Sequence, residues 1–195
     1  GGYRVYARVG PGPFTYAAWL EAIRGGASFV TNGPLVHDFT VDGFTIGQTA
    51  VVDSAHSFAL PVKIDVTSQW PIERVSLIVN GLEQAYFFPT GEGRYHFTAN
   101  SYAGVYGTSG WVALKVYAPW ANPGPFFTIG TQLYAHTSPI YVQVPGRPQA
   151  FWSPDPYYYR NWIDQVWSLA DARGWASPAD HDTALARVNL ARQII

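Results

Sequence analysis

Histidine and acidic residues are the side chains in this sequence that could bind a metal or transfer protons. The five histidines are His37, His56, His96, His136 and His181. None lies in a His-x-His or His-Glu-x-x-His pattern, and a metal site needs three or four ligands that converge on one point. The sequence also lacks the Gly-x-Ser-x-Gly elbow of hydrolases and the Gly-x-x-x-x-Gly-Lys phosphate loop. We therefore expect neither metal ligands nor catalytic residues within this chain.

Two short segments contain more polar residues than their local structure requires. The first is the tetrad Thr31-Asn32-Gly33-Pro34, where a turn alone would need only Asn or Gly. The second is His136-Thr137-Ser138-Pro139, which enters an apolar strand and could present its imidazole at the end of a sheet. Alternatively, its hydroxyl groups only satisfy the backbone at a turn.

Composition limits the class of protein. The chain has 195 residues, contains neither Cys nor Met, and starts with Gly. We interpret the missing Met as the sign of a processed product or a fragment, and the missing Cys excludes disulfides and thiolate metal sites. Charged residues make up 13% and the net charge is −1. Because no run of basic residues is present, we expect no binding to nucleic acid or to an anionic membrane surface.

Residues 116–146 contain no Asp, Glu, Lys or Arg. Prolines and polar residues interrupt this stretch, so we predict no membrane span. It is either a surface that another part of the protein covers, or the core of a sandwich with uncharged loops.

The order of expected elements indicates a mainly β fold. Residues 3–9 alternate, with Arg4, Tyr6 and Arg8 on one face of a strand, and a helix follows over residues 16–24. From residue 28 the pattern is all-β. The clearest strand alternates from Phe58 to Val66, and Asn80-Gly81 predicts a type I′ hairpin turn. About seven short strands predict an immunoglobulin-like antiparallel β-sandwich over residues 28–145.

Helical patterns return after Pro145-Gly146. One helix is expected to begin near Asp155 and to end before Gly174, and a second is expected to follow Ser177-Pro178. Two helices alone bury little apolar surface, so we predict that residues 146–195 form a helical extension packed on the sandwich.

Together these segments resemble the C-terminal region of the CehA/McbA-type metallohydrolases, whose catalytic part is an α/β barrel of the PHP (polymerase and histidinol phosphatase) type. The likeness spans about residues 3–170. Its motifs, in order, are Tyr3-Arg4-Val5-Tyr6, the helix from Trp19 to Gly26, Phe29 to Pro34, Val41-Asp42-Gly43, Val79-Asn80-Gly81, Ser109 to Leu114, His136 to Tyr141, and Trp162-Ile163-Asp164.

The resemblance implies that residues 1–27 are the last strand and helix of such a barrel. It also implies that divalent metals bind to His and Asp residues in a barrel that is missing from this chain and would be its partner. The chain would then be a non-catalytic C-terminal module, inactive alone, with Thr31, Asn32 and His136 lining the barrel interface or lying near its active site. The family acts on ester, carbamate or phosphoester-like bonds.

A second interpretation is a binding module for carbohydrate or another ligand. Sandwiches with exposed aromatic side chains can stack sugars on the aromatic rings. Trp120, Trp152 and Tyr158 are the candidate platform for this function. The same aromatic residues could instead belong to a core or to an interface that is exposed in this chain, and a homo-oligomer is a further possible partner arrangement.

Overall fold

The computed structural model describes residues 2–121, 131–150 and 154–194, which divide into two compact units, residues 1–150 and 151–195. The first unit is mainly β, as the sequence predicts. Its strands are β1 (Arg4–Ala7), β2 (Ser28–Thr31), β3 (Leu35–Val41), β4 (Phe44–Thr45), β5 (Thr49–Val51), β6 (Leu60–Thr67), β7 (Arg74–Val79), β8 (Leu82–Phe87), β9 (His96–Ala103), β10 (Gly110–Ala121), β11 (Thr131–Thr137) and β12 (Ile140–Gln143).

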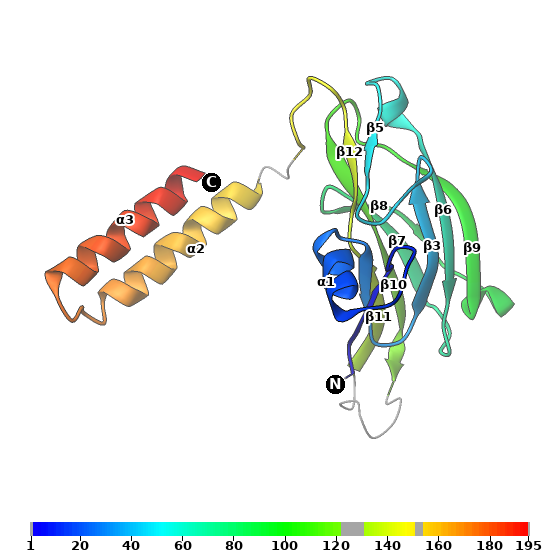
Figure 1. The fold of residues 1–195 in the computed structure, drawn as a ribbon, viewed down its shortest axis with the longest axis horizontal. Coiled ribbons are helices and arrows are strands. Elements are labelled where there is room, and N and C mark those ends of the chain that lie inside the picture. The colour runs from blue at the N-terminus through cyan, green and yellow to red at the C-terminus, as the bar shows by residue number, and fades with distance from the viewer. Residues whose placement is uncertain (1, 122–130, 151–153, 195) are drawn as a thin grey trace. The chain divides into compact units, whose positions relative to one another are not determined.

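The strands of the first unit form two sheets that face each other (Figure 1). Sheet A has the order β1-β2-β11-β10-β12-β5, with β7 paired to β10 and β8 paired to β7, and sheet B has the order β4-β3-β6-β9. Among the strands of the described residues, every pair is antiparallel except β5 with β12. This confirms the predicted antiparallel β-sandwich for the residues that the structure describes.

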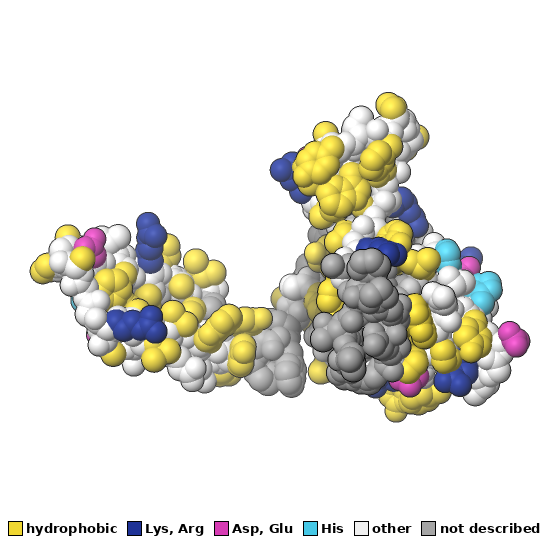
Figure 2. Space-filling view, turned by 90° about the horizontal axis from the view of Figure 1, so that it is seen from below, with side chains coloured by type: hydrophobic (Ala, Val, Ile, Leu, Met, Phe, Trp, Pro, Cys, Tyr) yellow, Lys and Arg dark blue, Asp and Glu magenta, His cyan; other side chains and the backbone are white. Residues whose placement is uncertain are grey.

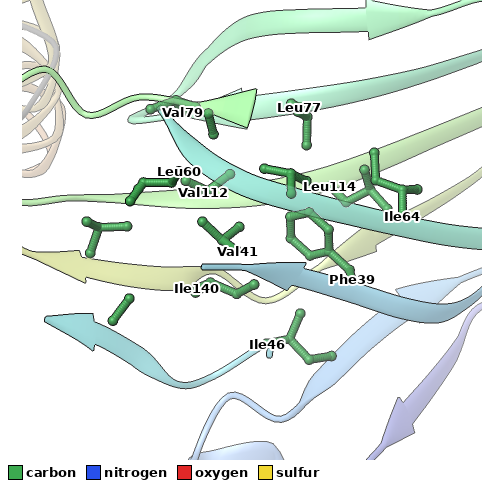
Figure 3. Packing of buried hydrophobic residues seen from close by; sticks show 14 of the residues in the cluster. Phe39, Val41, Ile46, Leu60, Ile64, Leu77, Val79, Val112, Leu114 and Ile140 are labelled. Atoms are coloured by element: carbon green, nitrogen blue, oxygen red, sulfur yellow. The ribbon is translucent and has the colours of Figure 1, made fainter. Parts of the chain in front are cut away.

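The core fills the space between the sheets. Alternate residues of β6 are buried, as period-two patterning requires, and they meet alternate residues of β7 and β10 from the other sheet. Figure 3 shows Phe39, Val41, Leu60, Leu77 and Leu114 directed into this space. The described parts of residues 116–146 contribute Val116, Leu133, Ile140 and other buried residues to the core or the sheet interior. That observation favours the core interpretation of the charge-poor stretch.

Two details of the predicted strands can be checked against the structure. Asn80 and Gly81 have φ values of 51° and 90°, which confirms the predicted type I′ turn between β7 and β8. Phe58, however, is not part of β6. It lies in a short 3₁₀ helix (His56–Phe58) and is 55% exposed, because the chain turns at Ala59 before the strand begins.

The N-terminal residues join the sandwich unit. β1 pairs antiparallel with β2, and helix α1 (Tyr16–Arg24) contacts β1 and lies beside sheet A (Figure 1). Thr15 caps α1 by accepting a hydrogen bond from the Ala18 amide at 3.1 Å, as its position before the helix predicts. Whether residues 1–27 derive from a barrel stays a prediction.

The second unit consists of helices α2 (Pro154–Asp171) and α3 (Pro178–Ile194), which pack against each other. Arg192 binds Asp164 between the two helices through its Nε and Nη2 atoms, at 2.8 and 2.7 Å. Trp167 and Trp175 stack with a ring separation of 5.6 Å beside the turn between the helices. The predicted packing of this extension on the sandwich stays a prediction.

Candidate functional site

The tetrad Thr31-Asn32-Gly33-Pro34 forms the connection between β2 in sheet A and β3 in sheet B. The Thr31 hydroxyl is buried and forms two hydrogen bonds. Its Oγ1 donates to the Pro34 carbonyl at 2.5 Å and accepts from the Gly33 amide at 2.9 Å. These two bonds fix the corner at which the chain leaves one sheet for the other.

The Asn32 side chain ties the same corner to β11. Its Nδ2 donates to the Gln132 carbonyl at 2.9 Å, and its Oδ1 accepts from the Tyr134 amide at 2.7 Å. The Asn32 amide also donates to the Tyr134 carbonyl at 3.1 Å. The side chain thereby continues the β2–β11 ladder where the backbone of β2 turns away, and it is only 5% exposed.

Thr31 and Asn32 are neighbours in the sequence, and their polar atoms already have partners within the fold. A buried group whose hydrogen bonds are satisfied has little left to offer a ligand. Thr31 and Asn32 hold the corner in place. The groups available for binding belong to other residues that line the cleft beside it.

A cleft of about 440 Å³ lies beside this corner, between the ends of the two sheets. Its aromatic and charged wall consists of Arg4 and Tyr6 on β1 and of Trp70 in the loop after β6. Thr31, Asn32, Gly33, Leu35, Thr67, Ser68, Gln69 and Gly2 complete the lining. The volume is within the range of small-ligand sites, about 300–1,000 Å³.

A second cleft of about 230 Å³ continues along the same strand. Tyr6 lines both clefts, and Arg8 and His37 line the second one. Tyr6 stacks on Phe29 of β2 with a centroid distance of 5.2 Å and an interplanar angle of 8°. The ring of Tyr6 is therefore held between the two clefts, with one arginine on each side of it along the strand.

Arg4, Tyr6 and Arg8 share one face of the predicted strand, but the sequence pattern alone does not mark them as a site. Their alternation was the signal that could have identified them. No local pattern marks Trp70, because it reaches the cleft only through the pairing of β3 with β6.

His136 lies apart from the corner. Thr31 pairs with Ala135 across the β2–β11 ladder, and both are buried toward the sandwich interior, so His136 is directed to the opposite face of sheet A. Burial is the main cause that lowers the pKa of His136 below 6.5, and Lys115, its neighbour on β10, lowers this pKa further. The hydrogen bond between its Nδ1 and the Thr137 carbonyl, at 2.9 Å, acts in the opposite direction.

The candidate aromatic platform is only partly described. Trp152 and the Trp120 side chain lie outside the described residues. Tyr158 is on α2 and is 64% exposed, next to Tyr159 and Trp162, with ring separations of 5.4 and 6.4 Å.

Two of the remaining histidines, His56 and His96, each pair with one acidic residue, whereas His37 bonds the Thr67 hydroxyl at 2.6 Å. The imidazole of His56 binds Asp42 at 2.9 Å, and this hydrogen bond raises the pKa of His56 above 6.5. His96 binds Asp65 at 2.9 Å. In residues 2–121, 131–150 and 154–194, no three His, Asp or Glu side chains are grouped so that they could hold a metal ion. Over the same ranges, no helix is both long and apolar enough to cross a membrane.

The class that these observations define is a β-sandwich with a polar, aromatic cleft at one end of its two sheets. Comparison of the chain with protein-family models, curated proteins and solved structures finds no match. The cleft and its surroundings must therefore be interpreted from their own chemistry.

Proposed function

We propose that this chain is the non-catalytic C-terminal module of a metal-dependent hydrolase with a PHP-like barrel, and that it supports or lines the active site of that barrel. The metals and the hydrolytic chemistry belong to the barrel, so the chain alone is inactive. The proposal starts from the resemblance described above, and one observation on helix α1 supports it best.

The apolar stripe of α1 is only partly covered by the rest of the sandwich unit. Trp19, Leu20 and Ile23 are only half-buried, and α1 has no fully buried residue. Tyr16 at its start is 71% exposed, and Phe14 before it is 75% exposed. Large apolar side chains gathered on one element are typical of a surface that another domain covers.

The outer face of β1 extends this surface. Val5 on β1 and Tyr3 just before it are 46% and 55% exposed, and α1 contacts this strand. The buried corner at Thr31 and Asn32 holds β2, and therefore β1, in a fixed position. In the proposed function these two residues support the interface rather than touch the substrate.

The coding sequence upstream of Gly1 gives the first test. We expect it to encode strands and helices with His- and Asp-bearing motifs, and an upstream region without them would contradict the proposal. If they are present, the upstream domain can be produced separately and mixed with this chain. We expect the two to form a complex that is measurable by calorimetry.

Two variants then locate the interface. Replacing Phe14 and Tyr16 together by Ser should weaken the complex about tenfold or more, because exposed aromatic anchors dominate interface energies. The matched control is Tyr102→Ser, which removes an aromatic ring that is 67% exposed on β9 of sheet B. If the unchanged chain, the Phe14/Tyr16 double variant and the Tyr102→Ser control all bind the upstream domain with equal affinity, α1 is not the contact.

A second candidate function is carbohydrate binding through aromatic residues. The observation that favours it is the exposed group Tyr158, Tyr159 and Trp162 on α2. In Figure 2, hydrophobic side chains cover much of the visible surface of this helical unit. A polysaccharide pull-down tests it: binding that Trp162→Ala abolishes supports this function, and no binding to any glycan removes it.

A further inference from the structure

Strand β1 has one edge that pairs with no described strand. It is the last strand of sheet A, and β2 is its partner on one side. The Arg8 amide donates to the Ala27 carbonyl at 2.8 Å, so Arg8 and Ala27 form a hydrogen-bonded pair of the antiparallel ladder. Because such pairs alternate, the N–H and C=O groups of Val5 and Ala7 point away from β2, toward the open edge.

The side chains next to this edge are cationic and aromatic. Arg4, Tyr6 and Arg8 share one face of the strand and line the two clefts described above. Both arginines are exposed, and neither forms an ion pair with any residue in the described part of the chain. No acidic residue is among the described residues that line either cleft.

We propose that the open edge of β1 binds an extended peptide with the pattern acidic–x–apolar–x–acidic, which adds to sheet A as an antiparallel strand. The backbone of the peptide pairs with the N–H and C=O groups of Val5 and Ala7. Its two acidic side chains lie opposite Arg4 and Arg8, and its apolar side chain lies opposite Tyr6.

The geometry of an antiparallel ladder favours this arrangement. On the open side, Arg4, Tyr6 and Arg8 would occupy the pairs without hydrogen bonds, where facing Cα atoms are closest, at about 4.5 Å. Opposite charges and aromatic–apolar pairs at such positions stabilise the added strand. Addition of a strand to a sheet edge is a general mode of peptide recognition.

An acidic oligosaccharide is the competing ligand for the same arginines. It would satisfy their charge, but it has no alternating N–H and C=O groups at the spacing of about 6.8 Å that separates Val5 from Ala7 along the strand. The unpaired backbone of β1 therefore favours a peptide. This inference rests on the open edge of β1, whereas the proposed barrel interface concerns α1 and the outer face of β1. A barrel strand paired along that edge would exclude the peptide.

Binding can be measured with the full chain and a labelled peptide, acetyl-Thr-Glu-Thr-Val-Thr-Glu-Thr-amide, by fluorescence anisotropy. The register control is acetyl-Thr-Thr-Glu-Val-Glu-Thr-Thr-amide, which has the same composition but directs both acids to the other face of a strand. We expect saturable binding of the first peptide and about tenfold or more weaker binding of the second. Hydrogen exchange should slow at the amides of Val5 and Ala7 when the first peptide is bound.

Charge reversal provides the decisive variant. Arg4→Glu together with Arg8→Glu should weaken binding of the Glu peptide about tenfold or more and create binding of a Lys version of it. Both arginines are exposed, so the fold should persist, and circular dichroism verifies this. The control Arg147→Glu reverses an exposed charge in the loop after β12 and should leave the affinity for both peptides unchanged.

Three results would overturn the inference. The first is no binding of the Glu peptide at millimolar concentration. The second is equal binding by the charge-reversed variant. The third is binding of an acidic oligosaccharide that competes with the peptide and leaves the exchange of Val5 and Ala7 unchanged, which would assign the clefts to saccharides.

Discussion

Replacing Asn32 by Ala tests whether this residue holds the corner between β2 and β3 or serves a ligand. The change removes the side-chain hydrogen bonds to Gln132 and Tyr134 but leaves the backbone bond from the Asn32 amide intact. A buried polar group that loses its partner costs about 1–3 kcal/mol. With two groups affected at a site that is 5% exposed, we expect the free energy of unfolding to fall by about 2–4 kcal/mol.

Urea unfolding followed by circular dichroism measures this loss, and hydrogen exchange of amides in β10 assigns it to the sandwich unit. Domains of this kind have stabilities of about 5–15 kcal/mol, so the variant should remain folded in water. Asn100→Ala is the control, because Asn100 is exposed on β9, and surface changes of this kind fall within about 0.5 kcal/mol. An equally small loss of unfolding free energy for Asn32→Ala would refute the supporting role and would favour a role of Asn32 in ligand contact.

Further predictions concern single side chains. Gly47→Ala should be much more destabilising than Gly43→Ala in urea unfolding. Both glycines have φ near +80°, but a Cβ at position 47 would overlap the backbone of Gly25 and Gly26, whereas position 43 is open. Thr31→Val should lower stability by about 1–3 kcal/mol, whereas Thr31→Ser should retain most of it, because only Ser keeps the hydroxyl; equal losses would contradict this. The pKa of His136 is lowered in the folded state, so the stability that it contributes is present above pH 6.5 and is lost as the pH falls below that value. His136→Gln should therefore show a smaller loss of unfolding free energy on acidification than the unchanged chain, and an unaltered pH dependence would contradict this prediction.

The sequence predicts the elements whose residues alternate strongly or carry defined turn residues. Val62, Ile64 and Val66 of β6 point inward because valine and isoleucine alternate with polar residues. Strand β11 was not predicted as a separate strand. Its inward residues include Ala135 and Thr137, which are too weakly apolar to mark a period, and pairing with β2 and β10 decides its conformation.

The candidate site was predictable only in part. The tetrad at Thr31 stands out locally, but its bonds to β11 join residues about a hundred positions apart. The separation of His136 from that tetrad follows from the strand register, which a single sequence does not specify. Trp70 comes to the cleft through the same kind of long-range pairing, so neither pattern nor propensity could reveal it.

The pairing of β2 with β11 also constrains how the chain folds during synthesis. On the side of β2 that faces β11, Val30 has no ladder partner until His136 has left the ribosome. Sheet B, which contains β3, β6 and β9, needs nothing beyond Ala103 and can form earlier. Sheet A therefore can close only late in synthesis, when every strand of sheet B is already available, and the N-terminal strand β1 joins a supported sheet only after most of the chain has been made.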